Sequence, residues 1–172
     1  MPIRHATAQD CAAIATIYNH AVLHTNAIWN EATVDDENRR NWLSHRQEAG
    51  YPVRVAVEGT QVIGYATFGD WRSFEGFRHT VEHSVYVHPD HQGKGIGKAL
   101  MLTLIDDAKQ IGKHVMVAAI ESQNHGSIHL HRRLGFTLTA QMPQVGTKFG
   151  RWLDLTFMQL QLDHRTQPDA CS

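Results

Sequence analysis

The segment at residues 80–100 constrains the fold of this chain more than any other. Its first part, residues 80–87, is rich in valine and predicts a β-strand. A glycine-rich turn follows and leads directly into the apolar stripe of a helix over residues 95–112. The turn contains three glycines at alternate positions, which are Gly93, Gly95 and Gly97. A strand, tight turn and helix in this order leave unpaired backbone amides at the helix start, where they favour a phosphate group.

The remaining segments predict an α/β protein with a mixed sheet that carries helices on both faces. Alternating or β-branched patterns predict further strands at residues 3–6, 53–68, 115–120, 136–142 and 152–162, the second of these as an antiparallel hairpin. Apolar residues at helical spacing predict one helix that starts at an Asp10 cap, one from a Thr33 cap to Gly50, and one at residues 124–134.

The length and composition predict one compact domain at residues 1–162, followed by a disordered tail at residues 163–172. The formal net charge is −1, so the chain has no overall positive field that would attract nucleic acid or an anionic membrane. No apolar run approaches the roughly 18 residues that a membrane span needs. The two cysteines, Cys11 and Cys171, lie at opposite ends of the chain, the second in a polar tail, so we expect no disulfide framework and a reducing compartment. We therefore expect a cytoplasmic protein that binds neither nucleic acid nor a membrane.

Two familiar phosphate-binding loops do not fit the glycine turn. Its spacing differs from the G-x-G-x-x-G pattern of dinucleotide sites, and the Lys-Ser/Thr pair of a P-loop is absent. The turn instead resembles the pyrophosphate loop of the GNAT superfamily, whose pattern Gln/Arg-x-x-Gly-x-Gly/Ala is matched by Gln92, Gly95 and Gly97. In that family the preceding strand splays from its neighbour at a bulge, and its backbone binds the pantetheine arm.

This resemblance implies acetyl-CoA as the acyl donor. A second family segment supports it, because residues 124–136 are similar to the Asn-x-x-Ser/Ala and Gly-Phe pattern in which the asparagine contacts the cofactor. The alternative role of Asn124 is a plain helix N-cap, and one side chain can serve both. The residues implied at the cofactor are Val85, Tyr86, Val87, Gln92, Gly93, Lys94, Gly95, Ile96, Gly97, Lys98 and Asn124.

Other segments resemble one particular group within this superfamily. Residues 17–22, 27–29, 68–72 and 81–87 are similar to those of the phosphinothricin and methionine sulfoximine/sulfone acetyltransferases. This similarity implies acetyl transfer to the α-amino group of a free L-amino acid or a toxic analogue, by direct attack on the thioester. It also implies a homodimer.

The chemistry of acetyl transfer needs a base, because an amine is protonated at neutral pH. Glu82 is the candidate, since a carboxylate inside a valine-rich strand is desolvated and its pKa should rise toward a useful value. Its alternative role is a solvent-facing or paired carboxylate. His131 stands where the family often has a tyrosine that protonates the departing thiolate, and a histidine can do this near neutral pH. Its alternative role is a structural imidazole.

The loop at residues 70–79 supplies candidates for substrate binding. Arg72 and Arg78 are expected to hold the substrate carboxylate, because a guanidinium binds it with two hydrogen bonds, although either could be a solvated surface residue. Aromatic residues could line the side-chain pocket or belong to the core or a dimer contact. The residues expected at the substrate are Trp29, Arg72, Phe74, Glu75, Gly76, Phe77, Arg78 and Glu82.

The thirteen histidines suggest a metal site at first sight, with His125 and His129 one helical turn apart and His83, His88 and His91 close in sequence. No acid or cysteine completes a tetrahedral set at a suitable spacing, so we expect no metal. Two other functions stay open. One is acetylation of peptide or protein amines, and the other is a non-catalytic sensor that binds coenzyme A.

Overall fold

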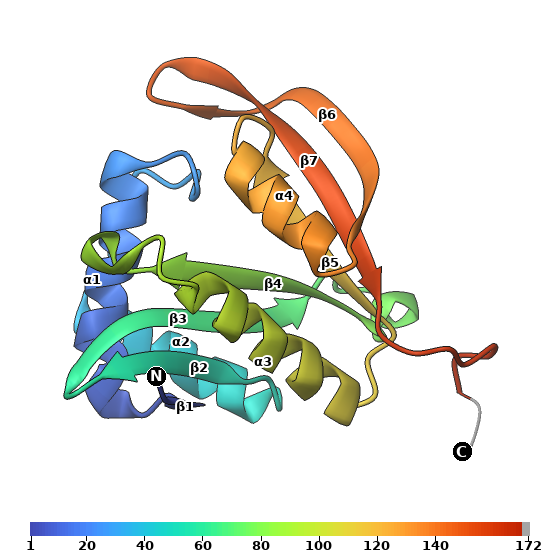
Figure 1. Ribbon diagram of the computed structural model, residues 1–172, viewed down its shortest axis with the longest axis horizontal. Helices are drawn as coiled ribbons and strands as arrows, with labels where there is room; N and C mark the ends of the chain where they lie inside the picture. Colours follow the sequence, from blue (N-terminus) through green and yellow to red (C-terminus); the bar gives the residue numbers. More distant parts are fainter. Residues whose placement is uncertain (170–172) are drawn as a thin grey trace.

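The computed structural model describes residues 1–169 and has one mixed sheet of seven strands in the order β1-β2-β3-β4-β5-β7-β6. All neighbouring strands are antiparallel except β4 and β5. The strands are β1 (Ile3–His5), β2 (Val53–Glu58), β3 (Gln61–Asp70), β4 (Thr80–Val87), β5 (Val115–Glu121), β6 (Thr137–Lys148) and β7 (Arg151–Gln161). The α-helices are α1 (Cys11–His24), α2 (Asp36–Glu48), α3 (Ile96–Gln110) and α4 (His125–Arg133). The expected mixed sheet is therefore confirmed (Figure 1).

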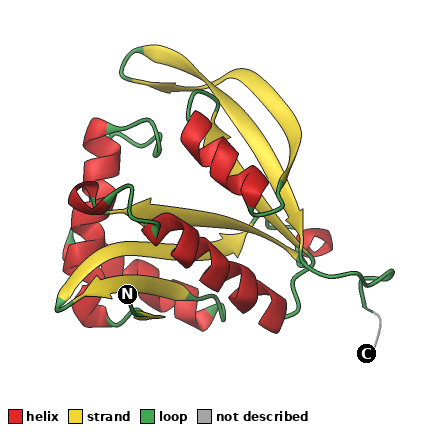
Figure 2. Cartoon of the chain, in the orientation of Figure 1, coloured by secondary structure: helices red, strands yellow, loops and turns green. Residues whose placement is uncertain are grey.

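Helices cover both faces of the sheet, as the sequence predicts (Figure 2). One core cluster joins α3 to the sheet through residues such as Leu100, Leu104 and Met116. A second cluster, which includes Ile14, Leu43 and Tyr65, joins α1 and α2 to the opposite face. Both layers are needed because β3 is buried along almost its whole length, so it must be covered on either side.

The sheet opens at β4, and this opening positions the site. β4 pairs with β3 from Val81 to Val87, but it pairs with β5 only from Thr80 to Glu82. Beyond Glu82 the two strands diverge, which Figure 1 shows as a wedge between β4 and the part of the sheet that carries α4. The β3–β4 register has no irregularity, so the splay occurs without the bulge expected on that strand.

One helix start differs from the expected one. The N-cap of α2 is Asp35, whose carboxylate accepts a hydrogen bond from the amide of Asn38 at 2.8 Å, and not Thr33. Asp10 is the N-cap residue of α1, as predicted, but its side chain caps no amide of that helix, because its carboxylate accepts two hydrogen bonds from Arg4 and one from the amide of Thr7. Several residues before α2 are good N-caps, and the sequence alone does not rank them.

The β6–β7 hairpin is longer than the sequence predicts and extends beyond the rest of the sheet (Figure 1). It is tied to the end of α1 by Lys148, which is 2% exposed and whose ammonium donates hydrogen bonds to the carbonyl oxygens of Ala21 and Ile28. Trp29 packs on Gly146 so closely that a Cβ there would overlap the indole ring. The loop after α1 is therefore held by the hairpin.

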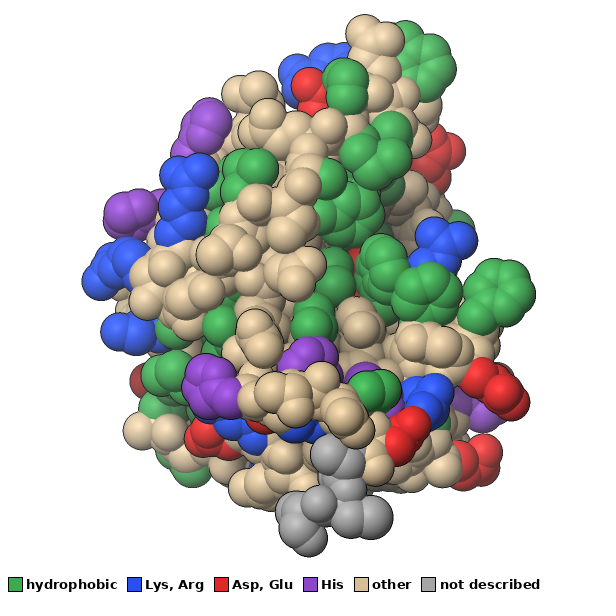
Figure 3. Space-filling view, turned by 90° about the vertical axis from the view of Figure 1, so that its right-hand side faces the viewer, with side chains coloured by type: hydrophobic (Ala, Val, Ile, Leu, Met, Phe, Trp, Pro, Cys, Tyr) green, Lys and Arg blue, Asp and Glu red, His purple; other side chains and the backbone are tan. Residues whose placement is uncertain are grey.

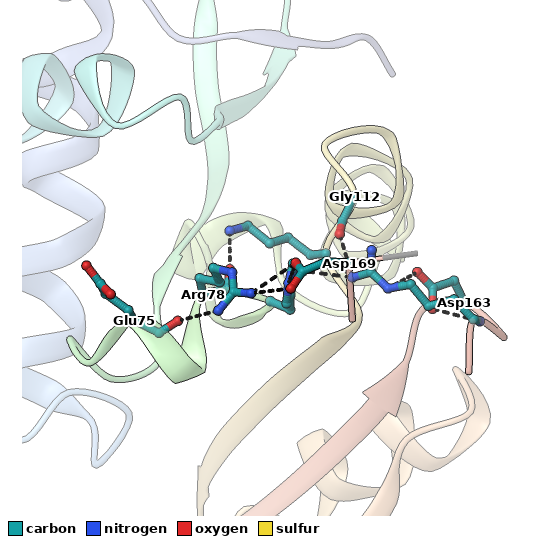
Figure 4. Close-up of polar contacts among 8 residues, drawn as sticks. Glu75, Arg78, Gly112, Asp163 and Asp169 are labelled. Carbon is teal, nitrogen blue, oxygen red and sulfur yellow. Dashed lines mark hydrogen bonds and ion pairs between the residues drawn. The ribbon is translucent and has the colours of Figure 1, made fainter. Parts of the chain in front are cut away.

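The segment after β7 runs without helix or strand but makes polar contacts with the domain. Asp163 lies 2.6 Å from His114 Nδ1, and Arg165 donates a hydrogen bond to the carbonyl oxygen of Gly112 at 2.9 Å. Asp169 accepts two hydrogen bonds from Arg78, at 2.7 and 2.9 Å (Figure 4). Residues 170–172 of the expected disordered tail lie outside the described residues.

Candidate active site

The glycine turn has the geometry of a cradle for an anion. Gly93 and Gly95 have φ angles of 77° and 79°, in the left-handed region that favours glycine, and a Cβ on either would meet no other atom within 4 Å. Gly95 is the N-cap of α3, and the first hydrogen bond of that helix runs from the amide of Ala99 to the carbonyl oxygen of Gly95. The amides of residues 96–98 therefore precede the helical ladder and are available to a phosphate group.

Gly97 is different from the other two glycines. Its backbone is helical, and a Cβ there would make an ordinary contact at 3.8 Å with Val87. The protein fold does not need a glycine at this position. A ligand that approaches the first turn of α3 closely would need one.

The residues expected at the cofactor lie around this turn and along the splayed strand. Residues 83–87 of β4 are paired only with β3, so their backbone groups on the β5 side are available to a ligand. Gln92, Lys94 and Lys98 are exposed beside the turn, whereas Ile96 is buried against the core. Asn124 lies across the wedge at the start of α4, where its side chain accepts a hydrogen bond from the amide of Ser127 at 3.2 Å. It thus fills the N-cap role, and its contact with the cofactor stays a prediction.

Glu82 occupies the last residue pair that joins β4 to β5, opposite Val117. Successive strand residues point to opposite faces, so Glu82 shares its face with Tyr86, which packs on the α1 side of the sheet. Burial raises the pKa of Glu82, as the sequence predicts. Tyr86 lies partly buried on the same face, and this burial raises the pKa of its hydroxyl to about 12. A carboxylate with a raised pKa next to an unpaired strand segment is suited to accept a proton.

His131 forms a pair with His83, which the sequence did not predict. The rings are stacked with 5.1 Å between centroids, and their Nε2 atoms lie 3.0 Å apart. His131 Nδ1 is 2.7 Å from the carbonyl oxygen of Ser127, and a carbonyl only accepts, so Nδ1 carries the proton. In the neutral pair, His83 Nε2 then donates to His131 Nε2. Burial lowers the pKa of both imidazoles, that of His83 to about 3.

This arrangement sets a condition on the expected proton donor. Neutral His131 has one proton, and that proton is held by Ser127, so His131 can release one from Nε2 only in its imidazolium form. Burial disfavours that form. The role of His131 as a proton donor to the thiolate stays a prediction. His83 looks like an ordinary strand residue in the sequence, so only the position of α4 over β4 reveals the pair.

The two candidate arginines differ in their surroundings. The guanidinium of Arg78 is bound by the carboxylate of Asp169 and also donates to the carbonyl oxygen of Glu75 (Figure 4). Arg72 is exposed, and its guanidinium lies 5.7 Å from the ring centroid of Trp71 and 5.8 Å from that of Phe77. Gly76 is exposed in the same loop, and Phe74 is 70% exposed. Of the two arginines, Arg72 is therefore the freer to bind a substrate carboxylate.

The other candidate groups are placed as follows. Trp29 donates from its indole nitrogen to the carbonyl oxygen of Asn26 at 2.8 Å and lies in the loop that the β6–β7 hairpin holds. His88 and His91 pack edge to face near the glycine turn, while His83 lies with His131 instead. Within residues 1–169 there is no group of three or more histidine, cysteine, aspartate or glutamate side chains that could hold a metal ion.

An open glycine turn at a helix start, a strand splayed beside it and a half-buried glutamate at the splay are the features expected of an acyl-CoA-dependent acyltransferase. A sequence profile of the Acetyltransferase (GNAT) family matches residues 14–136. The chain belongs to the GNAT acetyltransferase family and is an enzyme of that class, as the glycine turn indicated.

Known relatives match almost the whole chain. The chain is 72% identical over 170 residues to the L-amino acid N-acyltransferase MnaT of Escherichia coli K12, with 99% of each chain covered. It is 70% identical over 171 residues to the L-methionine sulfoximine/L-methionine sulfone acetyltransferase of Salmonella typhimurium, covering 99% of this chain and 100% of the other. The solved structure of the acetyltransferase yncA from Salmonella typhimurium with acetyl-CoA has a TM-score of 0.96 and 69% identity, with 99% of this chain and 98% of the other covered.

Proposed function

We propose that this protein transfers the acetyl group of acetyl-CoA to the α-amino group of a free L-amino acid or a close analogue such as L-methionine sulfone, L-methionine sulfoximine or phosphinothricin. The observation that carries the proposal is the position of Glu82, where β4 leaves β5. A base at this point lies next to the strand segment expected to bind the pantetheine arm. The names of the relatives support the amino acid as the acceptor.

The residues of this chain fit the donor. The amides at the start of α3 and the open space above Gly93 and Gly95 would hold the pyrophosphate, and the unpaired backbone of residues 85–87 would hold the pantetheine arm. Acetyl-CoA supplies an activated acyl group whose thioester carbonyl is open to attack by an amine. Amides along the splayed strand would stabilise the negative charge that develops on the carbonyl oxygen.

Glu82 has to remove a proton from the substrate ammonium group, directly or through a water molecule. Its raised pKa matches this task, because a base works best when its pKa is near the working pH. Arg72 is the proposed partner of the substrate carboxylate, with Trp29, Phe74 and Phe77 as the proposed walls around the substrate side chain. Arg78 can bind the substrate carboxylate together with Arg72 only after its ion pair with Asp169 opens.

The test is release of free thiol from acetyl-CoA in the presence of L-methionine sulfone, L-methionine sulfoximine, phosphinothricin and free amino acids. We expect turnover with at least one of them and loss of turnover in Glu82→Gln, with coenzyme A binding retained. Turnover with peptides but not with amino acids would favour the protein-acetylating alternative. Binding of coenzyme A without turnover on any amine would favour the sensor.

We also propose a homodimer formed through the β6–β7 hairpin. Several large apolar side chains are exposed there, which are Leu138, Met142, Val145, Phe149 and Trp152. Figure 3 faces the side of the molecule with β6 and β7 and shows hydrophobic side chains at the surface among other residues. Several large apolar side chains exposed on one hairpin are typical of a protein interface. Light scattering should give twice the chain mass, and Trp152→Arg should give the monomer; a wild-type monomer would contradict the proposal.

None of the helices within residues 1–169 combines the length and apolar character that a bilayer span requires. We propose that the protein acts in the cytoplasm. Cys11, a buried free thiol, fits a reducing compartment. Cell fractionation with a marker enzyme for each compartment would check this.

A further inference from the structure

A second cavity, open to solvent, lies where α2 meets the end of β3. Its volume is about 460 Å³, and it is lined by Arg39, Trp42 and Arg46 of α2 together with Gly69 and Asp70 of β3. This size is in the range of small-molecule sites. None of the residues expected at the acyl donor lines it, and neither does Glu82.

Arg46 is a half-buried cation without a partner of opposite charge in contact. Its guanidinium lies over Gly69, where a Cβ would overlap it, and burial lowers its pKa while Asp70 partly opposes that shift. Within residues 1–169, no ion pair and no hydrogen bond of this guanidinium is formed. Partial burial makes such a cation less favourable, and a carboxylate in the cavity would compensate it.

Arg39 supplies a second guanidinium on the same face of α2. Residues 39, 42 and 46 are three and four positions apart, so Trp42 lies between the two arginines. The guanidinium carbon of Arg39 is 4.7 Å from the Trp42 ring centroid, and its nitrogens donate to the neutral amide oxygen of Asn38. Neither arginine is therefore bound to a carboxylate, and both remain able to bind a planar anion.

Asp70 carries the opposite charge and lines the same cavity. Asp70 accepts a hydrogen bond from the hydroxyl of Tyr51 and keeps a carboxylate oxygen for a second donor. Two guanidinium groups and a carboxylate around one cavity match the opposite charges of a zwitterionic α-amino acid. We propose that this cavity is a second binding site, which holds a free amino acid by its carboxylate at Arg46 and Arg39 and by its ammonium at Asp70.

The second site lies beside the catalytic strand without being at the thioester. Gly69 is the register partner of Glu82, so the guanidinium of Arg46 covers the position across the strand from the proposed base. An amino acid whose ammonium is held by Asp70 does not present an amine to Glu82. Binding at this site would let the protein respond to the concentration of free amino acid, and the bound molecule would not itself be acetylated there.

The test uses L-methionine as the probe and no acyl donor, so that no turnover occurs. Indole N–H signals are followed by NMR in the full-length protein, and the signal of Trp42 is identified from its loss in Trp42→Phe. We expect the Trp42 signal to shift with L-methionine and to a smaller extent with acetate, but not with L-methionine methyl ester, which lacks the carboxylate. Arg46→Met should weaken the binding about tenfold or more.

Arg40→Met is the matched control, because Arg40 lies on the same helix, is exposed and pairs with Asp36 at 2.8 Å outside the cavity. Its Kd for L-methionine should equal that of the wild type. If Arg46→Met does not fold, as judged by circular dichroism, Arg39→Gln replaces it, with the same expected loss of affinity.

Three results would overturn the proposal: no shift of the Trp42 signal, equal binding of the methyl ester, or unchanged affinity in the folded arginine variant. Glu82→Gln separates this site from the proposed activity, because it should abolish turnover and leave L-methionine binding at Trp42 in place. Equal loss of both would mean that the cavity is the acceptor site itself and that no second site exists.

Discussion

Glu82 and His83 are neighbours on β4, but they lie on opposite faces of the sheet and in different surroundings. Glu82 faces the layer of α1 and α2 beside Tyr86, whereas His83 faces α4 and stacks on His131. The same cause acts on both, because burial disfavours the charged form of each group. On one face it makes a carboxylate a better base, and on the other it keeps an imidazole neutral. One strand thus separates a group suited to proton transfer from a group suited to packing.

The largest expected effect is the loss of activity when Glu82 is replaced. We expect Glu82→Gln to lower kcat by about 100-fold to 10,000-fold, the range that a positioned general base contributes. Because the pKa of Glu82 is raised, the wild-type rate should fall as the pH drops through a value above the usual one for glutamate. The pH dependence of kcat/KM in the wild type and in His83→Phe checks this.

His83→Phe should leave that activity profile in place if the two faces are independent. If the acidic limb of the kcat/KM profile shifts by a full pH unit in His83→Phe, the two faces of β4 are not independent. Such a shift would mean that the imidazole pair takes part in the proton transfer.

The next effect is on stability and concerns His83 itself. Its pKa is about 3 in the folded protein and about 6.5 when unfolded, so the unfolded chain binds more protons between these values and stability falls as the pH drops below about 6.5. Between pH 7 and pH 5, His83 should remove about 2 kcal/mol from the free energy of unfolding.

Urea unfolding at the two pH values measures this change, and His83→Phe should remove that share of it. His24→Phe, at the exposed end of α1, serves as the control and should keep the wild-type pH dependence. An identical pH dependence in His83→Phe and the wild type would show that burial does not hold the His83 imidazole neutral at acidic pH.

A smaller effect tests the glycine turn. Gly97→Ala fits the fold, since its Cβ would make only an ordinary contact with Val87, and alanine favours the helix. We expect no loss of thermal stability but a Kd for coenzyme A that rises about tenfold, which corresponds to about 1.4 kcal/mol. Isothermal titration calorimetry and a melting curve on the same sample separate the two quantities. Unchanged affinity would contradict a close approach of the ligand at this turn.

The smallest effect is expected at Arg78. Its guanidinium is already bound by Asp169, so Arg78→Gln should raise the KM for L-methionine sulfone by less than about threefold, whereas Arg72→Gln should raise it about tenfold or more. Steady-state kinetics on the two variants side by side gives the ratio. The reverse order would assign the substrate carboxylate to Arg78.

Much of the fold was predictable because it depends on local patterns. The glycine turn, the valine-rich strand and the apolar stripe of α3 each specify their conformation from neighbouring residues, and together they indicated the family. The long β6–β7 hairpin was underestimated because its outer strand is largely exposed and carries few apolar residues in alternation. The cap of α2 was misplaced by two residues because Thr33 and Asp35 are both good N-caps.

The sequence by itself determined the tight glycine turn before α3 and the raised pKa of Glu82, since a glycine with a left-handed backbone and a carboxylate inside an apolar strand have consequences that do not depend on distant residues. Only the tertiary structure decided which side chains pair with one another. It stacks His131 on His83, 48 positions away, and pairs Arg78 with Asp169, 91 positions away. It also leaves Arg46 unpaired over Gly69. Side-chain partners of this kind are set by the packing of whole layers against each other, and no local pattern in the chain encodes which charges will meet.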